Sequence, residues 1–314
     1  ADGKLQAELI NAESEHSAAS ICLGASATGA RSFTASTSQG LLLMNEVLYN
    51  IAGLRLPIVL TGVNRAISAP LNIWNDTQDT FSVRDSGWIQ LYAQDNQEAV
   101  DLHIQAFKIA EDRRILLPVM ICVDGFLLTH TYESVEIPAQ EEVDKFLPKY
   151  EPLYYLTPKN PLTFGAFCEP DKYMEVRYMM EEAMENAKVV IQEVADKFKN
   201  AFGRFSGDLV EKYQIDDAEI VLISLGSLTG TLKDLVDELR AQNQKIGLLR
   251  IRAHRPFPKE ILLESLQNAK KIAVFEKAIS LGLGGILYSE VKSVFYGQTK
   301  APEISGFIVG LGGR

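Results

Sequence analysis

The sequence predicts an α/β protein built from two doubly wound domains, each with a mainly parallel sheet covered by helices on both faces. Short runs rich in valine, isoleucine and leucine, bounded by glycine or proline, recur along the chain and are typical of buried strands. Between them lie segments whose apolar residues repeat every three or four positions, as on one face of a helix. This alternation occurs twice, and each series predicts one sheet with right-handed crossovers.

The first series of elements occupies the N-terminal domain, residues 1–135. Its apolar runs predict four strands, at 7–12, 31–37, 56–64 and 116–125. Its periodic segments predict three helices, at 15–29, 38–55 and 96–112. The carboxyl ends of parallel strands share one edge of a sheet, and ligands bind at that edge in open α/β folds. We therefore look first at the residues that follow each strand.

The middle of the chain changes character. Residues 136–172 carry many prolines and little helical periodicity, which predicts an extended arm or linker. A long amphipathic helix is expected at 173–202, and its stripe of Met, Tyr and Val predicts a core or subunit contact. This helix opens the C-terminal domain, 173–314, whose strands are expected at 218–226, 246–254, 271–278 and 304–310 and whose helices are expected at 231–242, 258–269 and 284–296.

Composition narrows the class of partner. The chain has 314 residues, of which 46% are hydrophobic and 23% charged, with a formal net charge of −10 at pH 7. An acidic chain is a poor ligand for nucleic acid or an anionic membrane, since both need a basic face, and the one basic stretch, 250–259, is short. No apolar run is long enough to span a bilayer, and no signal segment opens the chain.

The cysteines and histidines lack the spacing of a metal or cluster site. The three cysteines are widely separated and odd in number, which is typical of reduced thiols in a cytoplasmic protein: Cys22, Cys122 and Cys168. The four histidines do not pair at ligand spacing either. The sequence begins at Ala1 rather than at a methionine and stops just after a predicted strand, so we expect the native protein to have further residues at both ends.

Two polar groups follow predicted strands of the first domain. Glu13, Glu15 and His16 open the helix after the first strand, where acids are favoured by the helix dipole, so a capping role competes with ligand binding. Arg65 follows the strand at 56–64 and can hold a carboxylate or phosphate with two parallel hydrogen bonds. A polar loop containing Asn72, Asn75, Asp76, Gln78 and Asp79 follows it, and a solvated loop with a capping arginine is the alternative.

Three further motifs are interpreted as structural. The glycine turns at 226–231 and 279–290 each follow a strand and open a helix, but neither matches a phosphate-binding fingerprint. They are more typical of tight strand-to-helix turns. His254 and Arg255 lie at a strand end before Pro256 and Pro258, which favours a structural or interfacial role.

Long ordered motifs carry a resemblance to a known family. The stretches "ESEHSA", "TASTSQGLLLM", "VNRAISAPLNIWNDTQDTFSVRDSGWIQLYAQDNQEAVDL" and "PVMICVDGF" resemble the α subunit of pyruvate:ferredoxin oxidoreductases. "RIRAHRPFP" and "KIAVFEKAISLG" look like the same subunit's transketolase C-terminal-like domain. The resemblance therefore implies that residues 1–135 form a thiamin-diphosphate pyrimidine-binding-like domain and that residues 173–314 contain the transketolase-like one.

The resemblance also implies roles for particular residues. Glu15 matches the glutamate that bonds the aminopyrimidine of thiamin diphosphate, and Ser38, Gln39 and Gly40 fall in a cofactor-binding motif. Arg65 matches the arginine that holds the carboxylate of the 2-oxoacid. The chain lacks the Tyr-Pro-Ile-Thr-Pro loop of the family, whose threonine also touches the substrate.

The implied reaction is shared between subunits. A β subunit is expected to carry the diphosphate, Mg²⁺ and a 4Fe–4S cluster, alongside γ and ferredoxin-like δ subunits. The complex would oxidise pyruvate to acetyl-CoA and CO₂ with coenzyme A and ferredoxin, and run the reverse synthesis. Two alternatives stay open: an enzyme for another 2-oxoacid (branched-chain, 2-oxoglutarate, indolepyruvate or oxalate), and a non-catalytic assembly subunit.

Overall fold

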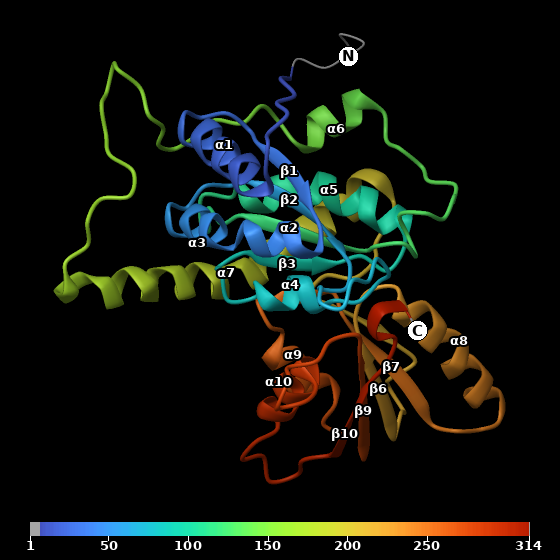
Figure 1. The fold of residues 1–314 in the computed structure, drawn as a ribbon. Helices are drawn as coiled ribbons and strands as arrows, with labels where there is room; N and C mark the ends of the chain where they lie inside the picture. The colour runs from blue at the N-terminus through green and yellow to red at the C-terminus, as the bar shows by residue number, and fades with distance from the viewer. Residues whose placement is uncertain (1–6, 314) are drawn as a thin grey trace.

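Two five-stranded sheets, each covered by helices on both faces, form the core of the protein. The structure is a computed structural model, and it describes residues 7–313. The first sheet has the strand order β1-β2-β4-β3-β8 and the second the order β10-β9-β6-β7-β5 (Figure 1). The predicted α/β class with two doubly wound domains is confirmed.

The first sheet is parallel except at one edge. Its strands are β1 (Phe33–Ser36), β2 (Val59–Asn64), β4 (Val119–Asp124), β3 (Ile89–Tyr92) and the antiparallel β8 (Ala253–Arg255). Side chains alternate between faces: Val59 and Val119 pack with α5 (Asn96–Ala110) and α7 (Pro170–Phe202). Leu60 and Met120 face the other way, toward α1 (Glu15–Ala27) and α3 (Asn45–Gly53). Strands buried on both faces explain the nearly continuous apolar runs in the sequence.

The second sheet repeats this plan on a smaller scale. Its strands are β10 (Glu303–Ile308), β9 (Lys271–Glu276), β6 (Ile220–Ser224), β7 (Ile246–Ile251) and the antiparallel edge strand β5 (Val210–Tyr213). Helix α8 (Leu228–Ala241) covers one face through Leu232 and Val236. The other face is covered by α9 (Lys259–Ser265) and α10 (Ile286–Val294), and the short turn η1 (Leu311–Gly313) ends the described chain.

Several predicted elements differ from the structure. The strand expected at 7–12 is absent: this segment has no regular structure, and Leu9 is 91% exposed, so it has no neighbour to pair with among the described residues. The helix expected at 38–55 divides into α2 (Ser38–Leu43) and α3, because the chain turns at the fully buried Met44. The elements β3, β5 and the short α4 (Gln78–Ser82) were not predicted.

One predicted strand serves both sheets. The run expected at 246–254 breaks at Arg252 into β7 of the second sheet and β8 of the first. Arg252 is fully buried, and its Nε donates to Glu98 Oε1 at 2.7 Å, so the chain turns where this guanidinium bonds a carboxylate of the first domain. The pairing of β8 with β3 therefore ties the C-terminal half of the chain to the first sheet.

A cluster of buried charges reinforces this connection. Arg250 Nη1 lies 2.6 Å from Glu98 Oε2, and Arg250 Nε lies 2.8 Å from Glu211 Oε2. We call Glu98, Glu211, Arg250 and Arg252 the arginine cluster. Nearby, His254 is also fully buried, with its Nε2 2.8 Å from Glu290 Oε2, and Arg255 pairs with the same glutamate at 2.6 Å. These contacts agree with the structural half of the role predicted for His254 and Arg255, which was structural or interfacial.

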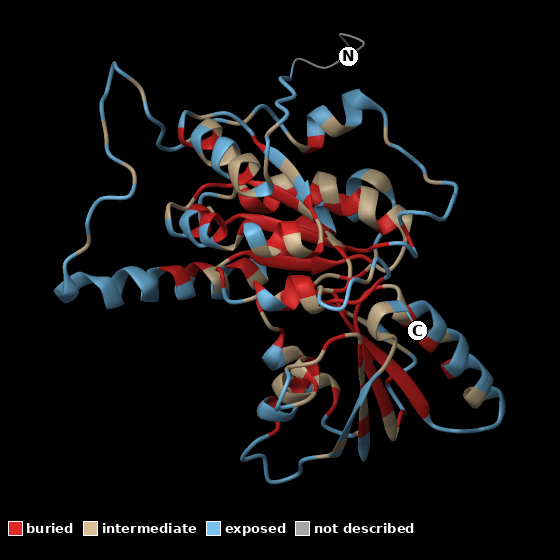
Figure 2. Cartoon of the chain, viewed as in Figure 1, coloured by how far each residue is buried: buried red, intermediate tan, exposed pale blue. Residues whose placement is uncertain are grey.

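The arm and the long helix leave part of the chain unsupported. The arm contains one short helix, α6 (Gln140–Phe146), and is otherwise irregular, as predicted. Helix α7 is buried only from Met180 onward, where it packs against α5 and the first sheet. Its N-terminal part, residues 170–179, is exposed and projects from the body of the molecule (Figures 1 and 2). Helix α7 was assigned to the C-terminal domain, yet it packs on the first sheet. The domain boundaries at 135 and 172 therefore stay predictions.

Candidate functional site

The first turn of α2 is hydrogen-bonded to α4 and to the segment that follows β2. Ser38 has a φ of 49°, a left-handed conformation that is uncommon outside glycine. Its backbone N–H donates to Asp79 Oδ2 at 3.0 Å and its hydroxyl donates to the carbonyl of Ala66 at 2.6 Å. Gln39 Nε2 reaches the carbonyl of Ser68 at 3.4 Å. The predicted residues Ser38 and Gln39 therefore face the segment that follows Arg65.

Glu15 lies against the same turn. It is the first residue of α1, its side chain is exposed, and Ser14 caps the helix by accepting a hydrogen bond from the Ser17 N–H at 3.3 Å. A β-carbon added at Gly40 would lie 2.7 Å from Glu15 Cγ and 2.8 Å from Glu15 Oε1. Only glycine leaves room there for this carboxylate. Glu15 therefore reaches the predicted edge of the sheet although the strand expected before it is absent.

Arg65 lies at the end of β2 and is half-buried. Its backbone N–H donates to Asp79 Oδ2 at 3.0 Å, the same oxygen that accepts the Ser38 N–H. Its Nε is buried and has no hydrogen-bond partner within residues 7–313. A buried guanidinium nitrogen left unpaired is costly, which makes Arg65 a candidate for pairing with a ligand.

Asp79 is the organising residue that the sequence did not reveal. The sequence places it in a polar loop, for which a solvated loop was the alternative interpretation, but it is fully buried, and Asn75 and Asp76 are each 1% exposed. Its carboxylate accepts four hydrogen bonds, from the backbone N–H groups of Ser38, Arg65 and Thr80 and from Asn64 Nδ2. Burial raises the pKa of Asp79 to about 6, against the opposing effect of these donors. The alternative of a solvated loop is therefore wrong for Asn75, Asp76 and Asp79.

The edge keeps further polar atoms without partners. Besides Arg65 Nε, the buried Ser36 Oγ and Asn64 Oδ1 have no hydrogen-bond partner among the described residues. Ser36 Oγ lies beside Glu15, since both would be 2.7 Å from a β-carbon at Gly40. We call Ser36, Asn64, Arg65 and Asp79, together with Ser38, the carboxyl-edge cluster. Its unpaired atoms are of the kind that a polar ligand satisfies.

Exposed apolar side chains border this cluster. The loop after Arg65 presents Leu71, Ile73 and Trp74, and the end of β4 presents Phe126 and Leu127, all at least 36% exposed. The rings of Trp74 and Phe126 are 5.4 Å apart between centroids. A polar edge bordered by exposed aromatic groups is suited to a site that another surface completes.

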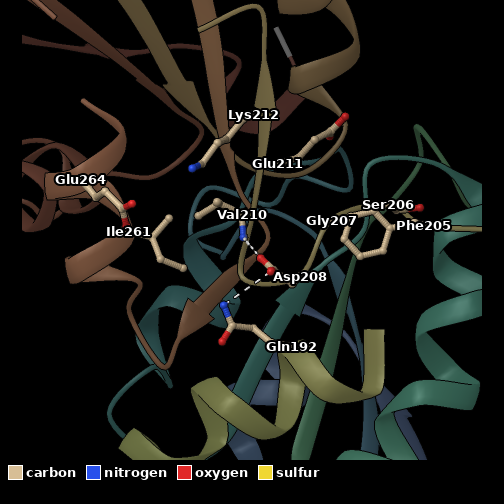
Figure 3. Close-up of a pocket in the computed structure, with 10 residues that line it drawn as sticks. All are labelled: Gln192, Phe205, Ser206, Gly207, Asp208, Val210, Glu211, Lys212, Ile261 and Glu264. Atoms are coloured by element: carbon tan, nitrogen blue, oxygen red, sulfur yellow. Dashed lines mark hydrogen bonds between the residues drawn. The ribbon is translucent and has the colours of Figure 1, made fainter. Parts of the chain in front are cut away.

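A large cavity lies elsewhere. It encloses about 560 Å³ between α7, β5 and α9 and is lined by residues such as Gln192, Asp208 and Glu264 (Figure 3). Asp208 is already engaged, because its Oδ1 accepts the N–H of Val210 at 3.3 Å and its Oδ2 accepts from Gln192 Nε2 at 3.5 Å. None of the predicted site residues lines this cavity.

Two protein-family profiles cover nearly the whole chain. The profile described as "Pyruvate flavodoxin/ferredoxin oxidoreductase, thiamine diP-bdg" matches residues 1–196, and "Pyruvate:ferredoxin oxidoreductase core domain II" matches residues 218–314. The chain belongs to the pyruvate:ferredoxin oxidoreductase family. The resemblance noted in the sequence is thereby confirmed, and the N-terminal half is a thiamin-diphosphate-binding domain of this family.

Curated relatives of the family align along the full chain. The "Pyruvate synthase subunit PorA" of Methanocaldococcus jannaschii is 55% identical and that of Methanothermobacter thermautotrophicus 51% identical, each over 100% of this chain and 80% or 81% of the relative. The "Ketoisovalerate oxidoreductase subunit VorA" of Pyrococcus abyssi is 47% identical over 100% of this chain and 79% of its own length. Pyruvate synthase subunits and a subunit for a different 2-oxoacid are thus both similar to the chain.

Solved structures share the fold at low identity. A 2-oxoglutarate:ferredoxin oxidoreductase from Magnetococcus marinus superposes with a TM-score of 0.70 at 18% identity, over 97% of this chain and 55% of that one. The chain thus spans about half the length of that protein. A split-gene transketolase superposes with a TM-score of 0.51 at 14% identity, over 94% of this chain and 73% of that one. Both likenesses concern the fold alone.

The described chain has neither a cluster of metal ligands nor a membrane-spanning helix. Residues 7–313 contain no group of three or more His, Cys, Asp and Glu side chains arranged to hold a metal ion. In the same residues, no helix is both long enough and apolar enough to cross a bilayer. The three cysteines are free thiols, and Cys122 is buried.

Proposed function

We propose that this chain is the pyrimidine-binding, substrate-binding subunit of a thiamin-diphosphate-dependent, coenzyme-A-acylating pyruvate:ferredoxin oxidoreductase. The single observation that carries the proposal is the unpaired Nε of Arg65 at the edge where Glu15 and Gly40 meet. The family and the 49–55% identity to six pyruvate synthase subunits support pyruvate as the 2-oxoacid. The alternative of a non-catalytic assembly subunit gives no reason for leaving these polar atoms unpaired.

Arg65 is assigned the carboxylate of the substrate. Arg65 follows a buried strand and its backbone N–H is held by Asp79, so the backbone from which its side chain extends is fixed before a ligand arrives. A planar guanidinium offers two parallel donors to a carboxylate, and binding would satisfy the nitrogen that is now unpaired. Holding the carboxylate orients the carbon–carbon bond that breaks when CO₂ leaves.

Glu15 is assigned the aminopyrimidine ring of the cofactor. Thiamin diphosphate, when bound, supplies the carbanion and the electron sink for decarboxylation. The residues fit such a ring: the Glu15 carboxylate is exposed, and Gly40 lets it lie against the first turn of α2. The Glu15 carboxylate would hold the proton that a ring nitrogen shares with it, which is a general acid–base role. Ser38, Gln39 and Gly40 shape this contact.

The remaining groups are assigned to partner subunits. A β subunit would supply the diphosphate site, Mg²⁺ and a 4Fe–4S cluster, and γ and ferredoxin-like δ subunits would pass electrons to ferredoxin. The exposed apolar side chains of α7, among them Tyr173, Met174 and Tyr178, are suited to such subunit contacts. The assembly is proposed to be cytoplasmic, with coenzyme A accepting the acyl group.

The test is an assay of the native complex. We expect viologen or ferredoxin reduction with coenzyme A to be fastest with pyruvate, and slower with 2-ketoisovalerate, the substrate class of the VorA relatives. Reconstitution with Glu15→Gln should lower turnover about 10²–10⁴-fold, as expected for loss of a general acid–base group, while the subunits still co-purify. Faster turnover with 2-ketoisovalerate would assign that substrate instead, and near-normal turnover of Glu15→Gln would remove Glu15 from the chemistry.

A further inference from the structure

Lys277 connects the second sheet to the loop that follows Arg65. It comes directly after β9, and its side chain is 11% exposed. Its carbonyl accepts hydrogen bonds from the Thr77 N–H at 2.9 Å and from the Thr77 hydroxyl at 3.1 Å. Its Nζ donates to Asn75 Oδ1 at 2.6 Å. Both of its partners, Thr77 and Asn75, are buried. The loop is therefore held by a residue that follows them in the sequence by 200 and 202 positions.

Asn75 passes this contact on to the end of β2. Its Nδ2 donates to the carbonyl of Asn64 at 3.3 Å, and Asn64 precedes Arg65. The loop is closed again by the Ala66 N–H, which donates to the carbonyl of Trp74 at 2.9 Å. The residues on both sides of Arg65, Asn64 and Ala66, are thus hydrogen-bonded to a loop that Lys277 contacts in turn.

Asp124 anchors the ammonium from the first sheet. It ends β4, is 2% exposed, and its Oδ2 lies 3.3 Å from Lys277 Nζ. The same oxygen accepts the N–H of Ser227 at 3.1 Å, and a β-carbon at Gly226 would lie 3.1 Å from Asp124 Oδ1. The carboxyl ends of β6 and β9 therefore meet the carboxyl end of β4 around one part-buried ion pair.

We propose that Lys277 is a positioning residue for Arg65, through which the second sheet fixes the geometry of the substrate-carboxylate site. The inference rests on the proposed role of Arg65. An ammonium that is only 11% exposed must keep its partners, since leaving it unpaired is costly. Its hydrogen bond to Asn75 is therefore maintained, and Asn75 in turn restrains the Asn64 carbonyl next to Arg65. Without the ammonium, Asn75 loses its hydrogen bond to Lys277 and no longer restrains the backbone next to Arg65.

The test compares Lys277→Met with the same substitution at Lys271, the lysine that begins β9. Lys271 lies at the start of β9, its side chain is 63% exposed, and Lys271→Met serves as the control. In the reconstituted complex we expect Lys277→Met to raise KM for pyruvate about tenfold, the usual effect of losing a hydrogen bond to a charged group. KM for coenzyme A and for the electron acceptor should stay unchanged, as should all three values in Lys271→Met. A purely structural role would lower the yield of active complex without this selective rise.

A double variant separates failure of the inference from failure of the proposed function. If Lys277 acts through Arg65, adding Lys277→Met to Arg65→Ala should raise KM for pyruvate no further. Independent, multiplying effects would overturn the inference while leaving Arg65 in the site. No effect of Arg65→Ala by itself would instead overturn the proposed role of Arg65, and the inference with it.

A second variant covers the possibility that Lys277→Met does not assemble. Asn75→Ala leaves the ammonium with Asp124 but removes its contact with the loop. We expect the same selective rise in KM for pyruvate from this variant. An assembled Asn75→Ala complex with unchanged KM would overturn the inference.

Discussion

Glu98 in the arginine cluster and Asp79 in the carboxyl-edge cluster are both fully buried carboxylates, yet their pKa values shift in opposite directions. Burial by itself raises the pKa of Glu98, but Arg250 and Arg252 outweigh it and lower the pKa below 4.5. Asp79 has only uncharged N–H donors around it, and burial raises its pKa to about 6. The charge of Glu98 is thus balanced by two cations, whereas Asp79 is stabilised only by uncharged hydrogen-bond donors.

The arginines of the two clusters differ in the same way. Every charge in the arginine cluster faces an opposite charge: Arg250 and Arg252 each bond Glu98 within 2.7 Å. Arg250 Nε and Glu211 Oε2 form no well-aligned hydrogen bond, but they pair as ions at 2.8 Å. Arg65 keeps a buried nitrogen without a partner in residues 7–313. A closed cluster joins two parts of a protein, and an unsatisfied one is suited to binding. Burial of charge therefore does not identify a site until the pairing has been counted.

The largest expected effect tests the closed cluster. Glu98→Gln would leave two buried guanidinium groups without their shared carboxylate, and we expect a loss of about 3–5 kcal/mol in the free energy of unfolding. Urea unfolding followed by fluorescence measures it, and Glu136→Gln, whose side chain is 78% exposed, is the control. Because the pKa of Glu98 is lowered in the fold, the deficit should be complete above pH 4.5 and shrink as the pH falls below it. An equal loss in both variants would contradict the distinction.

A smaller effect is expected where the carboxyl-edge cluster meets Glu15. Gly40→Ala would place a methyl group 2.7 Å from Glu15 Cγ and 2.7 Å from the buried Ser36 Oγ, so that both side chains must move. We expect turnover to fall about ten- to a hundredfold, a fraction of the general acid–base contribution. Gly24→Ala, where an added β-carbon meets nothing within 4 Å, should leave turnover unchanged. Equal turnover in the two variants would place Glu15 outside the reaction.

The smallest effect is a pH dependence from Asp79. Below about pH 6 its carboxyl takes up a proton in the fold and loses an acceptor for the N–H groups of Ser38 and Arg65. KM for pyruvate should therefore rise a few-fold, or about 0.5–1 kcal/mol, as the pH falls from 7 to 5. Asp79→Asn mimics the protonated form, so its KM should be raised at pH 7 and nearly flat over this range. A variant that keeps the wild-type pH profile would contradict this role.

The sequence predicted the fold where strands are buried on both faces. The apolar runs around Val59–Asn64 and Val119–Asp124 have no other good interpretation in a chain of this composition. It failed at β3 and β5, because these four-residue strands carry the polar Gln90 and the charged Glu211 and Lys212. Polar residues in such short segments hide the strand pattern from a reader of the sequence.

The site was predicted in part, for a similar reason. The positions of Glu15 and Arg65 follow from the ends of elements and from family motifs, and both residues reach the expected edge. The importance of Asp79 does not follow, because its partners Ser38 and Arg65 lie 41 and 14 residues away and no local pattern reveals its burial. Contacts that form only when distant segments fold together, such as that of Lys277 with Thr77, need the structure.

The most direct test of this account is the steady-state KM for pyruvate in a complex reconstituted with Arg65→Ala. An unpaired guanidinium that serves the substrate carboxylate predicts a rise of at least about tenfold. Arg65→Lys should give an intermediate value because it keeps the charge without the two parallel donors. KM for coenzyme A should not change, and the complex should assemble normally. An assembled Arg65→Ala complex with the wild-type KM for pyruvate would contradict the account.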